Sequence, residues 1–297
     1  MNFVRTPDER FGNLPAYDFE PNWFDWEGLR LHYLDEGEGP PVVLFHGEPT
    51  WAFLYRKMIP VLTAAGYQTI APDYPGFGRS DKPTDPDFYT YDRLTASMAA
   101  LVEHLDLSHA TAVVQDWGGP IGLRVATEAP ERFARLVVMN TGLFTGRPAN
   151  EAFAQWLSYV ERHPDLPVGR VVAGAAATTW GDDVIAGYEA PFPDQEHKMG
   201  AWRFPMIVPQ KEDDPGATEM LAVRDELGRW DKPAQVLFGD SDPIFSVRSG
   251  ARMADLIPGA GELEVVHGAG HFLQKDKGEE VAERIVEFLR RSEFGGS

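Results

Sequence analysis

The chain contains no cysteine. Disulfides, thiolate metal ligands and a cysteine nucleophile are therefore all excluded. Basic residues are also scarce, because 27 Lys and Arg stand against 46 Asp and Glu, which gives a formal net charge of −19. Nucleic acids and anionic membrane surfaces bind clustered Lys and Arg, so we expect neither as a partner. A long apolar run, of about 18 residues, is also missing, which predicts that the chain has no membrane-spanning helix.

The amino terminus lacks the apolar core of a signal peptide. It reads MNFVRTPDERFGNLP and carries acidic side chains, so we expect a cytoplasmic protein. The chain is, by contrast, rich in apolar residues. Its 297 residues are 43% hydrophobic and 12% aromatic, which is enough for one large domain or for a domain with a sizeable insertion.

Short apolar runs recur along the chain with helix-like segments between them. The expected strands cover residues 29–34, 41–46, 67–72, 111–115, 135–140, 234–239 and 263–267. The expected helices cover residues 91–107, 120–129 and 278–291. Continuous apolar character is typical of strands that are covered on both faces, as in a parallel sheet. The alternation therefore predicts an α/β fold with a mostly parallel central sheet flanked by helices.

The alternation stops after Asn140 and resumes near Ala234. The residues between them are rich in Trp, Pro and Ala and contain no clear strand run. We therefore predict a core built from residues 1–140 and 230–297, with a helical cap insertion at 141–229. Such a cap would lie over the carboxyl ends of the strands, where open α/β sheets bind ligands.

The most informative segment is TAVVQDWGG, at residues 111–119. An apolar β-branched run precedes Asp116, and the small residues Gly118 and Gly119 follow it before a helix-like segment begins. A strand, one polar residue at a tight turn and then a helix make up a nucleophile elbow. Most elbows carry Ser or Cys, whereas a carboxylate that attacks an sp³ carbon forms an ester that water can cleave. The elbow predicts hydrolysis that begins with such a displacement, with Asp116 as the nucleophile.

An ester on Asp116 would need an activated water to cleave it. His271 follows the last expected strand, and both its chemistry and the order nucleophile, acid, histidine favour it as the general base. The acid that orients the imidazole should follow the preceding strand, where GDSDPIF holds Asp240 and Asp242. We expect Asp242, since a residue before proline favours an extended backbone that projects its side chain from the strand end. Asp240 is the alternative.

Two N–H donors should hold the oxyanion that forms while the ester is cleaved. One is the backbone N–H of Trp117, the residue after the nucleophile. The other lies in the loop HGEPTW, where Gly47 allows the turn and the backbone N–H of Glu48 is the expected donor. A catalytic acid role for the Glu48 side chain is the alternative. We expect His46 to be a structural histidine buried beneath this loop.

Five motifs carry a resemblance to a known family. They are HGEPTW, APDYPGFGRSDKP, VVQDWGG, FGDSDPIF and GAGHFLQ, in this order. As a set they resemble the haloalkane dehalogenases of the α/β-hydrolase superfamily. The resemblance extends from RTPDERFGNLP to the last expected helix and is weaker in the cap. It implies the α/β-hydrolase fold with an inserted helical cap.

The resemblance also implies how a leaving halide is held. In that family one donor is the indole N–H of the Trp that follows the nucleophile, which is Trp117 here. One branch takes its second donor from an Asn in the HG-x-P loop and its acid from a Glu after the strand that follows the elbow helix. This chain has Glu48 and Asn140 at those places. The resemblance therefore implies the other branch, with Asp242 as the acid and a cap Trp as the second donor.

The cap motif of that branch places a Phe three residues before the halide-binding Trp. It matches AFAQW and gives Trp156, with Trp180 and Trp202 as competing candidates. Phe153 and Phe204 would line an apolar substrate pocket. Core packing is the alternative for both phenylalanines.

The resemblance implies the hydrolysis of small apolar haloalkanes to a primary alcohol, a halide ion and a proton. Asp116 would displace the halide toward Trp117 and Trp156, leaving an alkyl ester. Water activated by His271, with the support of Asp242, would then cleave the ester. This reaction needs no metal and no organic cofactor. We also expect a monomer.

Other interpretations stay open. An epoxide hydrolase would use the same Asp–His–Asp triad together with cap tyrosines, for which Tyr159 and Tyr188 are available. A fluoroacetate dehalogenase would need Arg residues beside the nucleophile, where this chain has Trp117 and Pro120. A non-catalytic α/β-hydrolase scaffold would not depend on Asp116 at all.

Overall fold

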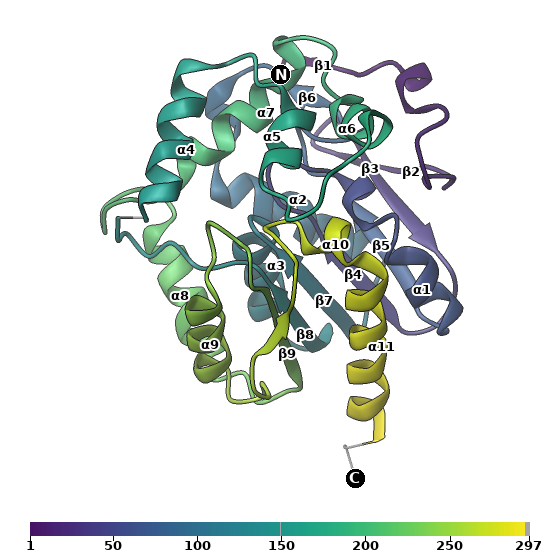
Figure 1. Ribbon diagram of the computed structural model, residues 1–297, viewed down its shortest axis with the longest axis vertical. Coiled ribbons are helices and arrows are strands. Elements are labelled where there is room, and N and C mark those ends of the chain that lie inside the picture. The colour runs from purple at the N-terminus through teal and green to yellow at the C-terminus, as the bar shows by residue number, and fades with distance from the viewer. Residues whose placement is uncertain (149, 295–297) are drawn as a thin grey trace.

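The computed structural model describes residues 1–148 and 150–294, and its central feature is an eight-stranded sheet (Figure 1). The strand order is β10-β9-β8-β7-β4-β5-β3-β2. The strands are β2 (Asn22–Trp26), β3 (Leu29–Glu36), β4 (Pro41–Phe45), β5 (Gln68–Pro72), β7 (Ala110–Gln115), β8 (Phe133–Met139), β9 (Ala234–Gly239) and β10 (Glu264–Val266). A separate antiparallel pair joins β1 (Phe3–Val4) to β6 (Lys82–Pro83). The predicted α/β fold with a mostly parallel sheet is confirmed.

Strand direction changes at one edge of the sheet. Across the sheet, each neighbouring pair in the order β5-β4-β7-β8-β9-β10 is parallel. Strand β3 pairs antiparallel with both β2 and β5. The apolar run at 29–34 therefore forms an antiparallel strand of the mostly parallel sheet. A continuous apolar run indicates that a strand is covered on both faces, as β3 is over most of its length. It does not indicate the direction of the strand.

Helices cover both sides of the sheet (Figure 1). In the body they are α1 (Ile59–Ala64), α2 (Tyr91–His104), α3 (Gly118–Glu128), α9 (Val247–Leu256), α10 (Leu273–Asp276) and α11 (Gly278–Phe294). Helix α1 packs against α11, and α2 packs against α3. Within the described residues, none of the helices is both long and apolar enough to cross a bilayer.

The interval 141–229 is helical and contains no strand among its described residues. Its helices are α4 (Glu151–Arg162), α5 (Val168–Gly174), α6 (Asp182–Glu189), α7 (Met199–Arg203) and α8 (Ala217–Leu227), with 3₁₀ turns at Glu196–Lys198 and Phe204–Ile207. In Figure 1, α4 to α7 gather at the top of the view, beyond one end of the sheet. Helix α8 instead packs against α3 of the body. The cap boundary at residue 229 stays a prediction.

Close packing joins α6 to the loop that follows β4. The indole N–H of Trp51 donates to the carbonyl oxygen of Gly187 at 3.1 Å. The Phe53 ring lies so near Gly187 that a Cβ at that glycine would come within 2.5 Å of it. This contact holds the helical insertion over the carboxyl ends of the parallel strands, where the loops with the expected site residues begin.

Candidate active site

The elbow between β7 and α3 forces the backbone into a sparsely populated conformation. Asp116 has a φ of +51°, which is uncommon for any residue other than glycine. A Cβ at Gly118 would lie 2.1 Å from the carbonyl oxygen of Phe45, and one at Gly119 would lie 1.9 Å from Oγ1 of Thr141. Only glycine fits at either position. The tight turn leaves the Asp116 side chain 16% exposed at the end of a fully buried strand.

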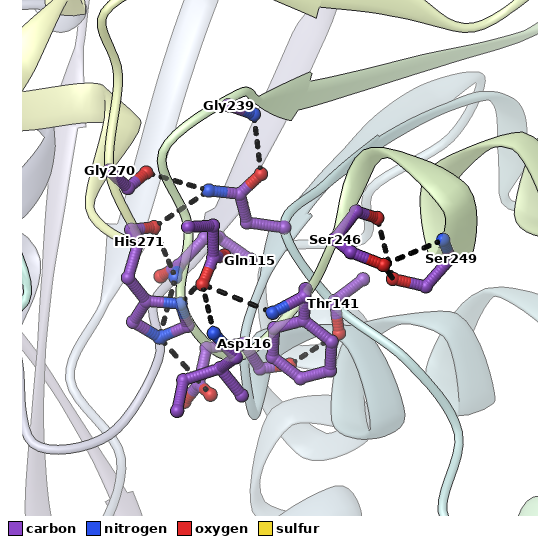
Figure 2. Close-up of polar contacts among 12 residues, drawn as sticks. Gln115, Asp116, Thr141, Gly239, Ser246, Ser249, Gly270 and His271 are labelled. Atoms are coloured by element: carbon purple, nitrogen blue, oxygen red, sulfur yellow. Dashed lines mark hydrogen bonds and ion pairs between the residues drawn. The ribbon is translucent and has the colours of Figure 1, made fainter. Parts of the chain in front are cut away.

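His271 lies between two carboxylates. Its Nε2 is 3.5 Å from Oδ2 of Asp116 (Figure 2). Its Nδ1 is 3.0 Å from Oδ2 of Asp242. The Asp242 side chain is fully buried, and its Oδ1 accepts hydrogen bonds from the backbone N–H groups of Ile244 at 2.7 Å and Phe245 at 3.1 Å. The three side chains therefore form an Asp–His–Asp chain in which the buried acid fixes the orientation of the imidazole.

The alternative acid, Asp240, faces a different histidine. Its Oδ2 is 2.9 Å from Nδ1 of His267, and its Oδ1 accepts a hydrogen bond from the backbone N–H of Gly268. Asp240 thus stabilises the turn after β10. The geometry pairs Asp242, and not Asp240, with His271.

The two carboxylates control the charge of His271. Burial by itself disfavours the imidazolium, but Asp242 and Asp116 outweigh it through charge and hydrogen bonding, and they raise the pKa of His271 to about 10. The proton therefore stays on His271 near neutral pH while both carboxylates are ionised. Loss of the negative charge on Asp116 would lower this pKa.

The loop that carries His271 is clamped to the sheet by two amides that the sequence analysis did not select. The side-chain Nδ2 of Asn140 donates to the carbonyl oxygens of Gly270 at 2.9 Å and His271 at 3.0 Å, while its Oδ1 accepts from the backbone N–H of Gly239 (Figure 2). Gln115 donates to the same His271 carbonyl at 3.2 Å. The position of Asn140 directly after a strand was the available signal, and its φ of +33° is visible only in the structure.

The loop after β4 lies against Asp116. The backbone N–H of Glu48 donates to Oδ1 of Asp116 at 2.7 Å, and Gly47 lies so close that a Cβ there would be 2.4 Å from Cβ of Asp116. His46 is fully buried beneath the loop, with Nδ1 3.0 Å from the Gly47 carbonyl oxygen and Nε2 accepting from the backbone N–H of Tyr74.

The Glu48 side chain is buried in the catalytic cavity and is not paired with His271. It is 6% exposed, and its Oε1 has no hydrogen-bond partner among the described residues. Burial and the nearby Asp116 carboxylate raise the pKa of Glu48 well above its ordinary value. Asp242, and not Glu48, therefore pairs with His271, and the alternative in which the Glu48 side chain is itself a catalytic acid stays a prediction.

A cavity of about 530 Å³ opens beside Asp116 and is largely apolar. Phe153 and Trp117 are among its lining residues, whereas Phe204 is not. The Phe204 ring is fully buried and packs edge-on against Trp117 and Phe77, which fits the core-packing alternative for this residue. Among residues 1–148 and 150–294, no group of three or more His, Asp or Glu side chains is arranged to hold a metal ion.

The cap aromatics divide into those that reach this cavity and those that do not. Trp156 and Tyr159 are among its lining residues, whereas Trp180, Trp202 and Tyr188 are not. Tyr188 is fully buried and stacks on the Trp180 ring. Of the three candidate cap tryptophans, Trp156 is the one that lines the same cavity as Asp116.

Comparison with known proteins agrees with this geometry. Residues 40–278 match the family model described as the alpha/beta hydrolase fold. The chain is 47% identical to a haloalkane dehalogenase of Psychrobacter cryohalolentis, over 97% of this chain and 98% of that protein, and 48% identical to one of Mycobacterium marinum, over 96% and 99%. The chain belongs to the haloalkane dehalogenases. It is a hydrolase that acts on carbon–halogen bonds, and the predicted α/β-hydrolase fold is confirmed.

A solved dehalogenase also has this architecture. The haloalkane dehalogenase DpaA from Paraglaciecola agarilytica NO2 superposes with a TM-score of 0.91 at 38% identity, covering 96% of this chain and 97% of that one. Its structure is described as tetrameric, which does not fit the expectation of a monomer. The epoxide hydrolase alternative is not favoured, because the similar curated proteins are dehalogenases and Tyr188, the second tyrosine it needs, lies outside the cavity.

Proposed function

We propose that this dehalogenase converts small apolar haloalkanes to primary alcohols through an alkyl ester on Asp116. The observation that carries the proposal is a carboxylate at the elbow, 3.5 Å from His271, at the base of an apolar cavity of about 530 Å³. A Ser at this place would form an ether with an alkyl carbon, whereas the ester formed by Asp116 can be hydrolysed.

The first step is displacement at the halogen-bearing carbon. An oxygen of Asp116 forms the new C–O bond while the C–X bond breaks, and the halide takes the bonding electron pair. Trp117 and Trp156 line the cavity, and neither indole N–H has a hydrogen-bond acceptor among the described residues. Both donors are therefore free to stabilise the negative charge that grows on the halide, and in an apolar cavity this stabilisation is large.

The second step is hydrolysis of the ester. His271 takes a proton from water, and the resulting hydroxide attacks the carboxyl carbon of Asp116. The bond between that carboxyl carbon and the alkoxy oxygen then breaks, the leaving oxygen takes the proton from His271 to give the alcohol, and Asp116 returns to a carboxylate that carries one oxygen from water after it loses a proton. The backbone N–H of Glu48, 2.7 Å from Oδ1 of Asp116, is placed to stabilise the oxyanion, with the N–H of Trp117 as the second donor.

Charge coupling makes His271 a better base when a base is needed. In the free enzyme the Asp116 carboxylate helps to raise the pKa of His271 to about 10, so the imidazole is protonated near neutral pH. Alkylation turns Asp116 into a neutral ester and removes this contribution, so the pKa of His271 falls and the neutral imidazole becomes available. Asp242 lies beside Nδ1 at 3.0 Å and stabilises the imidazolium that forms.

Halide release from 1,2-dibromoethane, measured beside the opening of a simple epoxide, tests the proposal. We expect bromide release by the wild-type protein and none above background by Asp116→Asn, since an amide cannot act as the nucleophile. Asp240→Asn is the matched control, because this residue pairs with His267 and not with His271. Epoxide opening without bromide release, or an active Asp116→Asn variant, would overturn the proposal.

A further inference from the structure

A second cavity, of about 560 Å³, lies behind an apolar wall of the catalytic cavity. Phe144, Phe153, Ile244 and Phe245 line both cavities. Three arginines also line the second cavity, and we therefore refer to it as the arginine cavity.

The charge of the arginine cavity is opposite to that of the molecule. Arg147, Arg224 and Arg252 line it, and no acidic side chain does so within the described residues, although the chain as a whole has 46 acidic and 27 basic residues. The side chains of Arg147 and Arg252 have no hydrogen-bond or ion-pair partner in the described part of the chain. Arg224 contacts the exposed neighbour Asp225 at 3.2 Å and keeps further N–H groups for another acceptor. The cavity therefore offers unpaired guanidinium groups.

Neutral donors add to this positive site. Ser246 is the N-cap of the ten-residue helix α9, and its Oγ accepts from the backbone N–H of Ser249 (Figure 2). The Ser249 hydroxyl donates to the Ser246 carbonyl oxygen at 2.6 Å, so the Ser246 hydroxyl is the one that can donate to a ligand. Both serines line the arginine cavity, and so does Asn150, whose amide donates to the Ile244 carbonyl oxygen at 2.8 Å. Hydroxyl and guanidinium donors beside an apolar wall suit a ligand with one anionic end and one apolar end.

The walls of the arginine cavity also support the catalytic residues from behind. Thr141, which lines it, donates through Oγ1 to the backbone carbonyl oxygen of Asp116 at 2.6 Å. The ring of Phe245 stacks against His271 with ring centroids 5.8 Å apart, and the backbone N–H of Phe245 bonds to Asp242. A ligand here would touch residues that position all three members of the triad.

We propose that the arginine cavity binds an organic carboxylate with an apolar chain, and that its occupancy changes the rate of dehalogenation through the shared wall. The carboxylate pairs with Arg224 and Arg252, and the chain covers the wall formed by Phe144 and Phe245. A small inorganic anion would leave this wall exposed to water, and an uncharged alcohol would leave the guanidinium groups unpaired. The binding site is independent of the chemistry proposed for Asp116.

Calorimetric titration with octanoate tests the binding site. We expect saturable binding to the wild-type protein, about tenfold weaker binding to the Arg224→Gln/Arg252→Gln double variant, and weaker binding of 1-octanol and of inorganic phosphate. Arg229→Gln is the matched control, because this exposed arginine pairs with Glu226 and does not line the cavity. The proposal is wrong if octanoate does not bind, if the double variant binds it as well as the control does, or if phosphate binds as tightly.

Kinetics with octanoate test the coupling to catalysis. Octanoate should change kcat for bromide release and leave residual activity at saturation, and the double variant should lose this effect while its rate without octanoate stays close to that of the wild type. Purely competitive inhibition would place octanoate in the catalytic cavity and overturn the proposal. Binding with no effect on turnover would contradict the coupling. If no bromide is released at all, the proposed function fails, but the calorimetric result still decides the binding site.

Discussion

The charge state of His271 depends on two neighbouring carboxylates. Asp242 and Asp116 are 3.0 and 3.5 Å from its two ring nitrogens, and together they outweigh burial and raise its pKa to about 10. A base that is already protonated cannot accept a proton from water. The proposed ester resolves this conflict, since its formation neutralises the carboxylate next to Nε2.

The Asp116→Asn variant should mimic the neutral ester. Because it removes one negative charge from the imidazolium, we expect the pKa of His271 to fall, by about 1 to 3 pH units. NMR titration of the imidazole measures this directly. Asp240→Asn serves as the control and should leave the pKa of His271 near its wild-type value. An unchanged pKa in Asp116→Asn would contradict the proposed coupling.

The indole N–H of Trp156 is the proposed second donor to the halide. If its indole N–H holds the halide together with Trp117, Trp156→Phe removes one hydrogen bond to an anion and should weaken bromide binding about tenfold. Trp180→Phe is the matched control, because Trp180 does not line the cavity. Fluorescence quenching by bromide measures both affinities. Unaltered bromide binding in Trp156→Phe, with binding lost in Trp180→Phe, would show that the cap assignment is wrong.

The candidate site residues that could be predicted from the sequence are those that follow a strand. Asp116, Asp242 and His271 each follow a strand, and the carboxyl ends of parallel strands meet at one edge of a sheet, so their proximity could be anticipated. Phe204 could not be placed, because its position depends on how a 3₁₀ turn packs against the body. From the sequence, Asn140 shows only that the Glu acid of one branch of the family is missing at this position. Its hydrogen bonds in the structure show that it holds the loop that carries His271.

At the scale of elements, the junction of β7 and α3 determines where the nucleophile stands. The strand is buried along its whole length, and the helix begins directly after Trp117 against the loop that follows β4. Gly118 and Gly119 permit this approach because any larger residue would overlap neighbouring atoms.

Gly118→Ala should therefore destabilise the protein. Its Cβ would lie 2.1 Å from the carbonyl oxygen of Phe45, a backbone atom that cannot move without shifting β4. We expect a loss of about 1 to 3 kcal/mol in the free energy of unfolding, measured by chemical denaturation. Gly261→Ala should have little effect, since a Cβ at Gly261 meets nothing within 4 Å. Equal stability of the two variants would contradict this account of the elbow.

The elements differ in how well the sequence predicts them. Every predicted strand and helix has a counterpart, because buried apolar runs and helical spacing are local signals. Strand β2 was missed because NWFDW mixes aromatic and polar residues, and α1 and α10 were missed because they are too short to show a helical period. The direction of β3 depends on its partners and so required the structure.

At the scale of the whole molecule, a net charge of −19 surrounds an apolar catalytic cavity. An uncharged haloalkane is not repelled by this field, whereas the halide product is, which favours its release after turnover. The arginine cavity is a local exception to the negative charge, since three arginines and no acidic side chain of the described residues line it. The tetrameric relative from Paraglaciecola agarilytica NO2 shows that this architecture also assembles into oligomers.

If Asp116 forms an alkyl ester that His271 helps to hydrolyse, removing the base should trap this ester. His271→Gln keeps the nucleophile but removes the base, so incubation with 1-bromobutane should release bromide once and leave a butyl group on the enzyme. Mass spectrometry should find the added mass on the peptide that contains Asp116. Steady bromide release without an adduct, or an adduct on any other peptide, would contradict the account.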